Sequence, residues 1–174
     1  MSRVEYLRTY VEQAGFLPSA TMVVAFYAFL RAARRSMWRI ALLALPGTIA
    51  HELMHLIVGL VLRAKPQALS IWPRRTGSRW TLGSVAFGNI GLLNGAFVTL
   101  APLLLLPAAW LCFVHVLLPL WVEGRWGAWL ASGYLAATAL FAALPSFQDL
   151  RVGAPSILLY ATMAGVLLLA YAYA

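Results

Sequence analysis

The stretch AHELMHLIVGLV, Ala50–Val61, places two histidines and one glutamate inside an otherwise apolar segment. Burying a polar side chain in hydrocarbon costs several kcal/mol unless that side chain has a partner. His51, Glu52 and His55 therefore need a structural or a chemical reason to lie there. The composition of the whole chain supplies the setting in which that reason must be found.

The composition predicts an integral membrane protein. The 174 residues are 63% hydrophobic and 10% charged, with a mean hydropathy of +0.82, whereas a soluble domain has about 25% charged residues. The length leaves room for one helical domain, residues 1–174. Met1–Gln13 is polar and of mixed charge, which is not the pattern of a secretory signal. The single Cys112 excludes an internal disulfide and a cysteine-rich metal site.

The formal net charge of +8 raises the possibility of nucleic-acid binding. However, the basic residues fall mainly in short connections between apolar segments, which is typical of membrane topology. The expected partner is therefore the lipid bilayer with its anionic headgroups, and no nucleic acid.

Apolar runs predict an all-α polytopic membrane protein with four to five transmembrane helices. The third run is long enough to tilt, or to bend at Pro102 and Pro107. Whether the first and last runs cross fully stays open at this point. In chain order, the runs are Ala14–Leu30, Trp38–Leu62, Gly91–Leu118, Gly127–Leu144 and Ala154–Tyr171.

The connection between the second and third runs has a different character. Gln67–Trp72 and Trp80–Phe87 are β-prone, and they flank the turn-forming sequence PRRTGSR. This pattern predicts a β-hairpin. The alternative is a solvated basic loop without strands.

Arg and Lys positions indicate the orientation. With the N-terminus inside, more of these residues fall on the inner side, although the cluster at Arg31–Arg39 then lies outside. We therefore expect a multi-pass protein of the cell membrane with its site nearer the cytoplasmic face.

The His-Glu-x-x-His spacing predicts a metal site. On a helix, residues four apart share a face, so His51 and His55 can bind one ion together, and neutral imidazole is a good zinc ligand. Glu52 can accept a proton from a metal-bound water, whose pKa the ion lowers to about 7. The alternative is a set of buried polar residues that join helices, which needs neither this spacing nor a carboxylate.

A catalytic zinc site usually has three protein ligands, and the chain offers few further acids. Glu123 lies in the polar connection WVEGRWG, and the other two acids lie before residue 14. Asp149 follows the fourth apolar run, where Pro145 ends or bends the helix, so it can turn back toward the histidines. The second and fourth runs cross in the same direction, which brings Asp149 to the depth of the histidines. The alternative for Asp149 is a helix-end pair with Arg151.

These residues resemble the site-2 protease family of intramembrane zinc metalloproteases. The resemblance rests on His51-Glu52-Leu53-Met54-His55 in one membrane helix and an aspartate after a proline near a later one. It implies zinc held by His51, His55 and Asp149, catalysis by Glu52, and a β-hairpin-like element after the motif helix. Leu150 stands where the family usually has glycine, and no asparagine shortly precedes the proline. The length implies a minimal member without PDZ or nucleotide-sensing domains.

Three residues are candidates for substrate binding. Asn94, like Asn89, could donate a hydrogen bond to a reacting carbonyl, although helix capping or helix packing is the ordinary role of such an asparagine. Leu82 and Ser84 lie on the hairpin, whose edge could hold an extended substrate. His115, near the far end of the third run, is expected to be a packing or interfacial histidine.

The sequence thus favours a zinc-dependent protease that hydrolyses peptide bonds of membrane-embedded proteins in or near the bilayer. One alternative is a membrane zinc hydrolase acting on a lipid or small amide. The other is a metal-binding membrane protein without catalysis, which would need the ligands but not Glu52.

Overall fold

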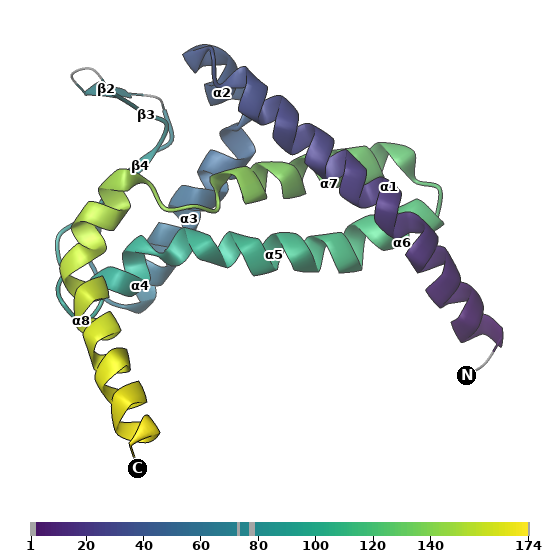
Figure 1. Cartoon of the computed structure of the whole chain (residues 1–174). Coiled ribbons are helices and arrows are strands. Elements are labelled where there is room, and N and C mark those ends of the chain that lie inside the picture. The colour runs from purple at the N-terminus through teal and green to yellow at the C-terminus, as the bar shows by residue number, and fades with distance from the viewer. Residues whose placement is uncertain (1–2, 73, 77–78, 174) are drawn as a thin grey trace. The chain divides into compact units, whose positions relative to one another are not determined.

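A computed structural model describes residues 3–72, 74–76 and 79–173, and most of these residues lie in helices (Figure 1). The helices are α1 Arg3–Ala33, α2 Met37–Leu43, α3 Leu45–Val61, α4 Gly95–Thr99, α5 Leu105–Cys112, α6 Leu118–Val122, α7 Trp126–Ala142 and α8 Phe147–Ala172. A 3₁₀ turn, Ala101–Leu104, precedes α5, and a π-helical turn, Phe113–Leu117, joins α5 to α6. The strands are β1 Pro66–Ser70, β2 Arg74–Thr76, β3 Arg79–Thr81 and β4 Ser84–Phe87.

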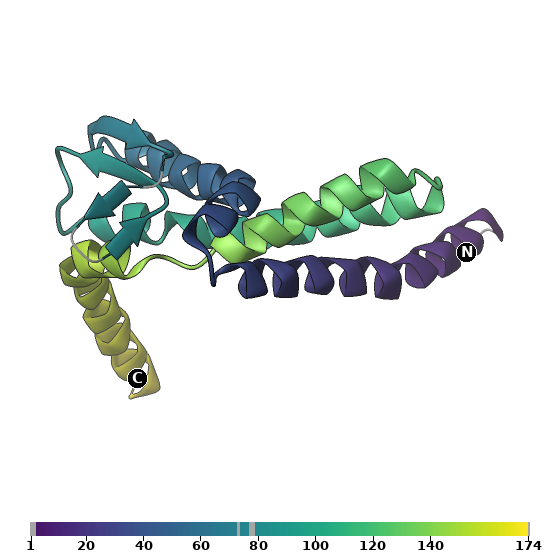
Figure 2. The same ribbon diagram turned by 90° about the horizontal axis from the view of Figure 1, so that it is seen from above.

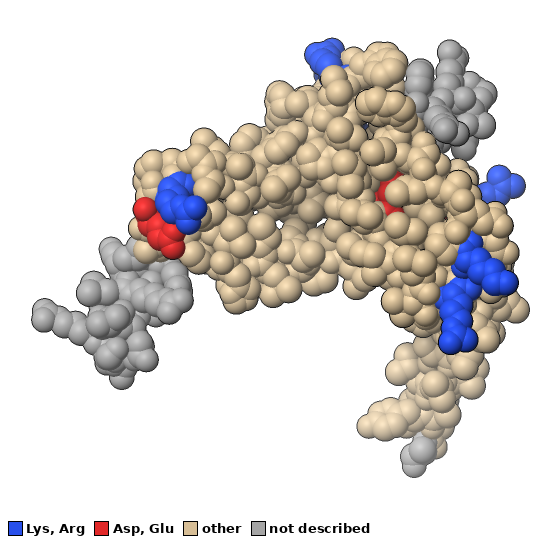
Figure 3. All heavy atoms as spheres, turned by 180° about the vertical axis from the view of Figure 1, so that it is seen from behind, with Lys and Arg blue, Asp and Glu red and all other residues tan. Residues whose placement is uncertain are grey.

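Among the described residues, three helical segments are long and apolar enough to cross a membrane: Ala14–Ala33, Ala101–Val122 and Phe147–Ala172. A fourth is added if α2 and α3 count as one broken span. Much of the face drawn in Figure 3 carries no charge, and its acidic and basic side chains gather in small patches. The fold therefore fits a membrane protein with three or four such helices, where the sequence predicted four or five.

The second predicted run, Trp38–Leu62, is not one continuous helix. It divides into α2 and α3, whose axes differ by 69°. Pro46 explains the break, because proline lacks an N–H and its ring clashes with the carbonyl four residues earlier, that of Leu42. In the first turn of α3 the same proline is tolerated.

The fourth predicted run, Gly127–Leu144, forms α7, which has 17 residues. A span needs about 20 residues, with a lower limit near 17, and α7 is not among the candidate spans. The third predicted run is helical only from Gly95, and the 3₁₀ turn lies at Pro102, where a bend was expected. The fifth run, Ala154–Tyr171, lies within the longer α8.

The connection between α3 and α4 contains the expected antiparallel strands, drawn as arrows in Figure 2. β1 pairs with β4 in the register Leu69 opposite Val85 and Ser70 opposite Ser84. β2 pairs with β3 further out, and the predicted turn PRRTGSR, residues 73–79, falls partly outside the described residues. The hairpin prediction is confirmed, and the solvated-loop alternative is wrong for the described strands.

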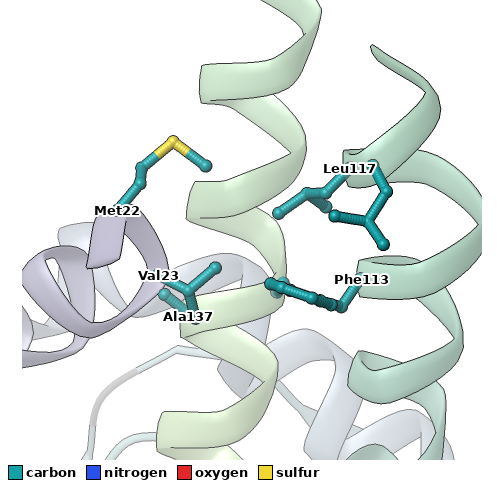
Figure 4. Packing of buried hydrophobic residues seen from close by; sticks show 7 residues of the cluster. Met22, Val23, Phe113, Leu117 and Ala137 are labelled. Atoms are coloured by element: carbon teal, nitrogen blue, oxygen red, sulfur yellow. The ribbon is translucent and has the colours of Figure 1, made fainter. Parts of the chain in front are cut away.

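The chain groups into two compact units, and no finding bears on the prediction of one domain spanning residues 1–174. The first unit comprises Met1–Ala50 and Leu104–Ala143. In it, Met22 and Val23 of α1 pack against Phe113, Leu117 and neighbouring α7 residues (Figure 4). In a bilayer, where lipid tails are as apolar as these side chains, close packing rather than water exclusion would hold such helices together.

The second unit comprises His51–Leu103 and Leu144–Ala174. In this unit α4 packs against α8 (Figure 1). Gly153 lies so close to Thr99 that a side chain at this glycine would clash. The Ser156 hydroxyl accepts from the Ala96 N–H (2.8 Å) and donates to the Leu92 carbonyl (2.7 Å). These contacts fix α4 to the helix that begins near Asp149.

Candidate metal site

His51 and His55 lie on one face of α3, as the motif predicts. Their Nε2 atoms are 3.2 Å apart, and their ring centroids are 4.8 Å apart. The His55 side chain is 6% exposed and that of His51 is 13% exposed. Both imidazoles therefore present the same nitrogen atom to one partly enclosed point.

Asp149 reaches that point from the first turn of α8. One of its carboxylate oxygens lies 3.6 Å from His51 Nε2, and the other lies 3.5 Å from His55 Nε2. A reciprocal capping box holds the residue in place: the Ser146 N–H donates to the Asp149 carboxylate (2.7 Å), and the Asp149 N–H donates to the Ser146 hydroxyl (3.2 Å). The carboxylate is thus positioned by the start of the helix.

The separations among these ligand atoms match those of a metal site. Tetrahedral zinc, with bonds of about 2.0–2.1 Å, keeps its ligand atoms about 3.3 Å apart. The observed separations of 3.2, 3.5 and 3.6 Å lie close to that value. Of the side chains that the structure describes, His51, His55 and Asp149 form the group that could hold a metal ion.

The second ring nitrogen of His55 is engaged by the protein backbone. Nδ1 lies 2.7 Å from the carbonyl oxygen of Val98 in α4. A carbonyl can only accept, so Nδ1 carries the proton, and neutral His55 therefore has a lone pair on Nε2. Such a partner fixes both the tautomer and the ring orientation of a metal-binding histidine.

Glu52 is buried beside these histidines on α3, with 6% of its surface exposed. Its carboxylate lies against Gly83, the residue before β4, where an added Cβ would sit 2.6 Å from Glu52 Oε1. The hairpin and the motif helix therefore meet at this carboxylate, and glycine is what permits the approach.

The candidate substrate-binding residues differ in their surroundings. Asn94 accepts from the Gly91 N–H (2.8 Å) and donates to the Asn89 carbonyl (2.9 Å), so its amide orders the loop before α4. Leu82 is half-buried just before β4, and Ser84 is exposed as the first residue of β4. Substrate binding by these residues stays a prediction.

Glu123 and His115, which the sequence analysis did not assign to the metal site, are both exposed. Glu123 is exposed and pairs with Arg125 at 3.3 Å, and His115 is exposed in the π-helical turn.

Sequence reasoning missed the support around the ligands. The Ser146–Asp149 cap was readable from its S-x-x-D spacing. The Val98 carbonyl had no sequence signal, because every residue carries a backbone carbonyl.

Comparisons with protein-family models, with curated proteins and with solved structures find no match to this chain.

Proposed function

We propose that this chain is an intramembrane zinc metalloprotease of the site-2 protease type, which hydrolyses peptide bonds in or near the bilayer. One observation carries the proposal. Two histidines of α3 and one aspartate of α8, which is distant from them in sequence, converge with separations suited to a metal. A buried glutamate lies beside them.

Each residue of the site has a role that its position supports. His51, His55 and Asp149 hold the zinc ion, and the Val98 carbonyl keeps His55 in the metal-binding tautomer. When bound, zinc supplies a Lewis acid and an activated water at neutral pH. Glu52 takes the proton from the attacking water and returns it to the leaving amine. Its burial keeps competing solvent away from this transfer.

The helices that carry the ligands favour a membrane setting. Asp149 lies in the first turn of α8, a 26-residue apolar helix, and the histidines lie on the α3 arm of the broken α2–α3 pair. We propose a multi-pass protein of the cell membrane with its site nearer the cytoplasmic face. Substrates in that setting are membrane-embedded proteins.

The meeting of β4 with Glu52 favours a peptide over a lipid or a small amide. A transmembrane substrate must leave its helix before water can attack its amide bonds. A β-strand edge can hold the resulting extended segment through main-chain hydrogen bonds. Among the described strands, β4 pairs with β1 alone, and β4 begins next to the buried carboxylate.

The Glu52→Gln variant tests the mechanism. Glutamine keeps the shape of the side chain and removes its basicity, so we expect bound zinc and a rate lowered by a factor of about 10² or more. The assay uses single-span peptides in lipid nanodiscs, with zinc-loaded protein and products identified by mass spectrometry. Full hydrolysis by Glu52→Gln would refute the mechanism. Lipid or small-amide turnover in place of peptide cleavage would favour the other zinc hydrolase.

A further inference from the structure

We propose that the turn between α1 and α2 binds the headgroup of an anionic phospholipid. This proposal is independent of the metal site and of hydrolysis. It rests on four exposed arginines at the end of α1 and the start of α2, named here the arginine turn: Arg31, Arg34, Arg35 and Arg39.

Among the described side chains, no acidic group pairs with the arginine turn. The sequence has no acidic residue between Glu12 and Glu52, so local carboxylates are also absent. Four guanidinium groups within so short a stretch of sequence repel one another, and an external anion relieves that repulsion. A phosphate suits the purpose, because guanidinium binds it through paired hydrogen bonds.

The arginine turn is held in shape by packing beneath it. The Arg34 guanidinium lies 4.5 Å from the centre of the Phe141 ring, in a cation–π contact. Leu30 and Ile40, on either side of the turn, belong to one buried cluster. The Tyr134 hydroxyl donates to the Leu43 carbonyl at the end of α2. The turn is therefore preorganised, which reduces the entropy lost on binding.

The surroundings of the turn indicate the level of the lipid headgroups. The apolar segment Ala14–Ala33 ends there. On α2, Trp38 and Leu42 lie one helical turn apart, and each is 65% exposed. Tryptophan is enriched where hydrocarbon meets headgroups, with arginines on the polar side. A headgroup phosphate is therefore expected at the level of the arginine turn. For this reason we favour a lipid over a free anion as the ligand.

The expected strength follows from the number of arginines. Each basic residue at an anionic surface contributes a factor of about five in affinity. Replacing three of them should therefore weaken binding on the order of a hundredfold.

The experiment uses the full chain in detergent, titrated with short-chain phosphatidylglycerol or with phosphatidylcholine of the same acyl chains. Binding is measured by native mass spectrometry and by the shift in thermal unfolding. The test variant is Arg31→Gln/Arg35→Gln/Arg39→Gln, which leaves the Arg34–Phe141 contact. A control of equal net charge is Arg63→Gln/Arg125→Gln/Arg151→Gln, since all three are exposed.

We expect phosphatidylglycerol to bind the wild type and the control, and the test variant to lose about a hundredfold in affinity. Should the test variant not fold, Arg35→Gln alone should lose about fivefold. The proposal is overturned if these variants keep wild-type affinity, if the control loses as much, or if phosphatidylcholine binds equally. Saturation by inorganic phosphate at the lipid's concentration would assign the turn to a free anion and also overturn it.

Discussion

Replacing Asp149 separates its proposed role as a metal ligand from its role in the capping box with Ser146. Alanine removes both roles, because it can neither bind a metal nor accept from the Ser146 N–H. Asparagine keeps an oxygen that can accept this hydrogen bond, which measures 2.7 Å. It loses the negative charge that makes carboxylate a zinc ligand. The two variants should therefore agree in metal affinity and differ in stability.

The magnitudes follow from the two sets of contacts. Changing a residue that merely orients a metal ligand costs 10–100-fold in affinity, so losing one of three ligands should cost more than about a hundredfold. Losing the hydrogen bond from the Ser146 N–H to the side chain of residue 149 should cost about 0.5–1.5 kcal/mol in Asp149→Ala and little in Asp149→Asn. The bond from the backbone N–H of residue 149 to the Ser146 hydroxyl is kept in both variants.

The assay measures zinc content after purification and affinity by competition with a chromogenic chelator. Unfolding is compared in excess chelator at pH 8, where unperturbed histidine, with a pKa of about 6.5, is neutral. The matched control is Glu123→Ala, which removes an exposed carboxylate paired with Arg125. If Asp149→Asn binds zinc like the wild type, or if Glu123→Ala loses zinc, the assignment of the third ligand is wrong.

Two further substitutions test the surroundings of the site. Gly83→Ala should lower the rate of peptide hydrolysis by a factor of about 10² with zinc still bound. The new Cβ would lie 2.6 Å from Glu52 Oε1 and would displace this carboxylate. An unchanged rate would show that Glu52 tolerates the shift. Ser156→Ala should destabilise the protein by about 1–3 kcal/mol in denaturant titrations, since it leaves the Ala96 N–H without its acceptor. Thr162→Ala is the control and should cost far less, because among the described residues the Thr162 hydroxyl donates to the Leu158 and Leu159 carbonyls of its own helix.

Local rules were sufficient to predict which residues of the candidate site come together. Helical periodicity brings His51 and His55 to one face, and this holds whatever surrounds the helix. Asp149 was predicted because few acids remain in an apolar chain, and its approach to the histidines agrees with that reasoning. Both inferences needed residue type and spacing, which a sequence displays directly.

Other features depend on contacts between distant segments. Asn94 could have been a catalytic donor or a structural residue, and only the folded loop shows its amide engaged by backbone. The break between α2 and α3 did have a signal in Pro46, but the continuous apolar character of Trp38–Leu62 concealed it. Hydrophobicity indicates which residues avoid water, whereas a helix ends where its backbone hydrogen bonds fail.

The strand edge beside Glu52 leads to a last prediction. Proline lacks the N–H that a β-ladder needs, so a proline facing the substrate should impair cleavage without disturbing the fold. Leu82 precedes the β1–β4 ladder, and Ser84 forms the last residue pair of that ladder with Ser70. Neither residue therefore lies in the middle of the ladder. Successive N–H groups of a strand point to opposite edges. The N–H groups of Ser84 and Val85 point to opposite edges of β4, so Val85→Pro is the matched control for Ser84→Pro.

We expect the Leu82→Pro or the Ser84→Pro variant to cleave a membrane-embedded peptide at least tenfold more slowly than the wild type. Zinc content and thermal unfolding should stay at wild-type values. One lost main-chain hydrogen bond costs about 0.5–1.5 kcal/mol, and a misplaced substrate costs more. If the Ser84 N–H points to substrate, that of Val85 points to β1, and Val85→Pro should destabilise the hairpin itself. Normal cleavage by both Leu82→Pro and Ser84→Pro, with the strands intact, would refute substrate capture at this edge. The peptide would then reach Glu52 by a route that does not add a strand to β4.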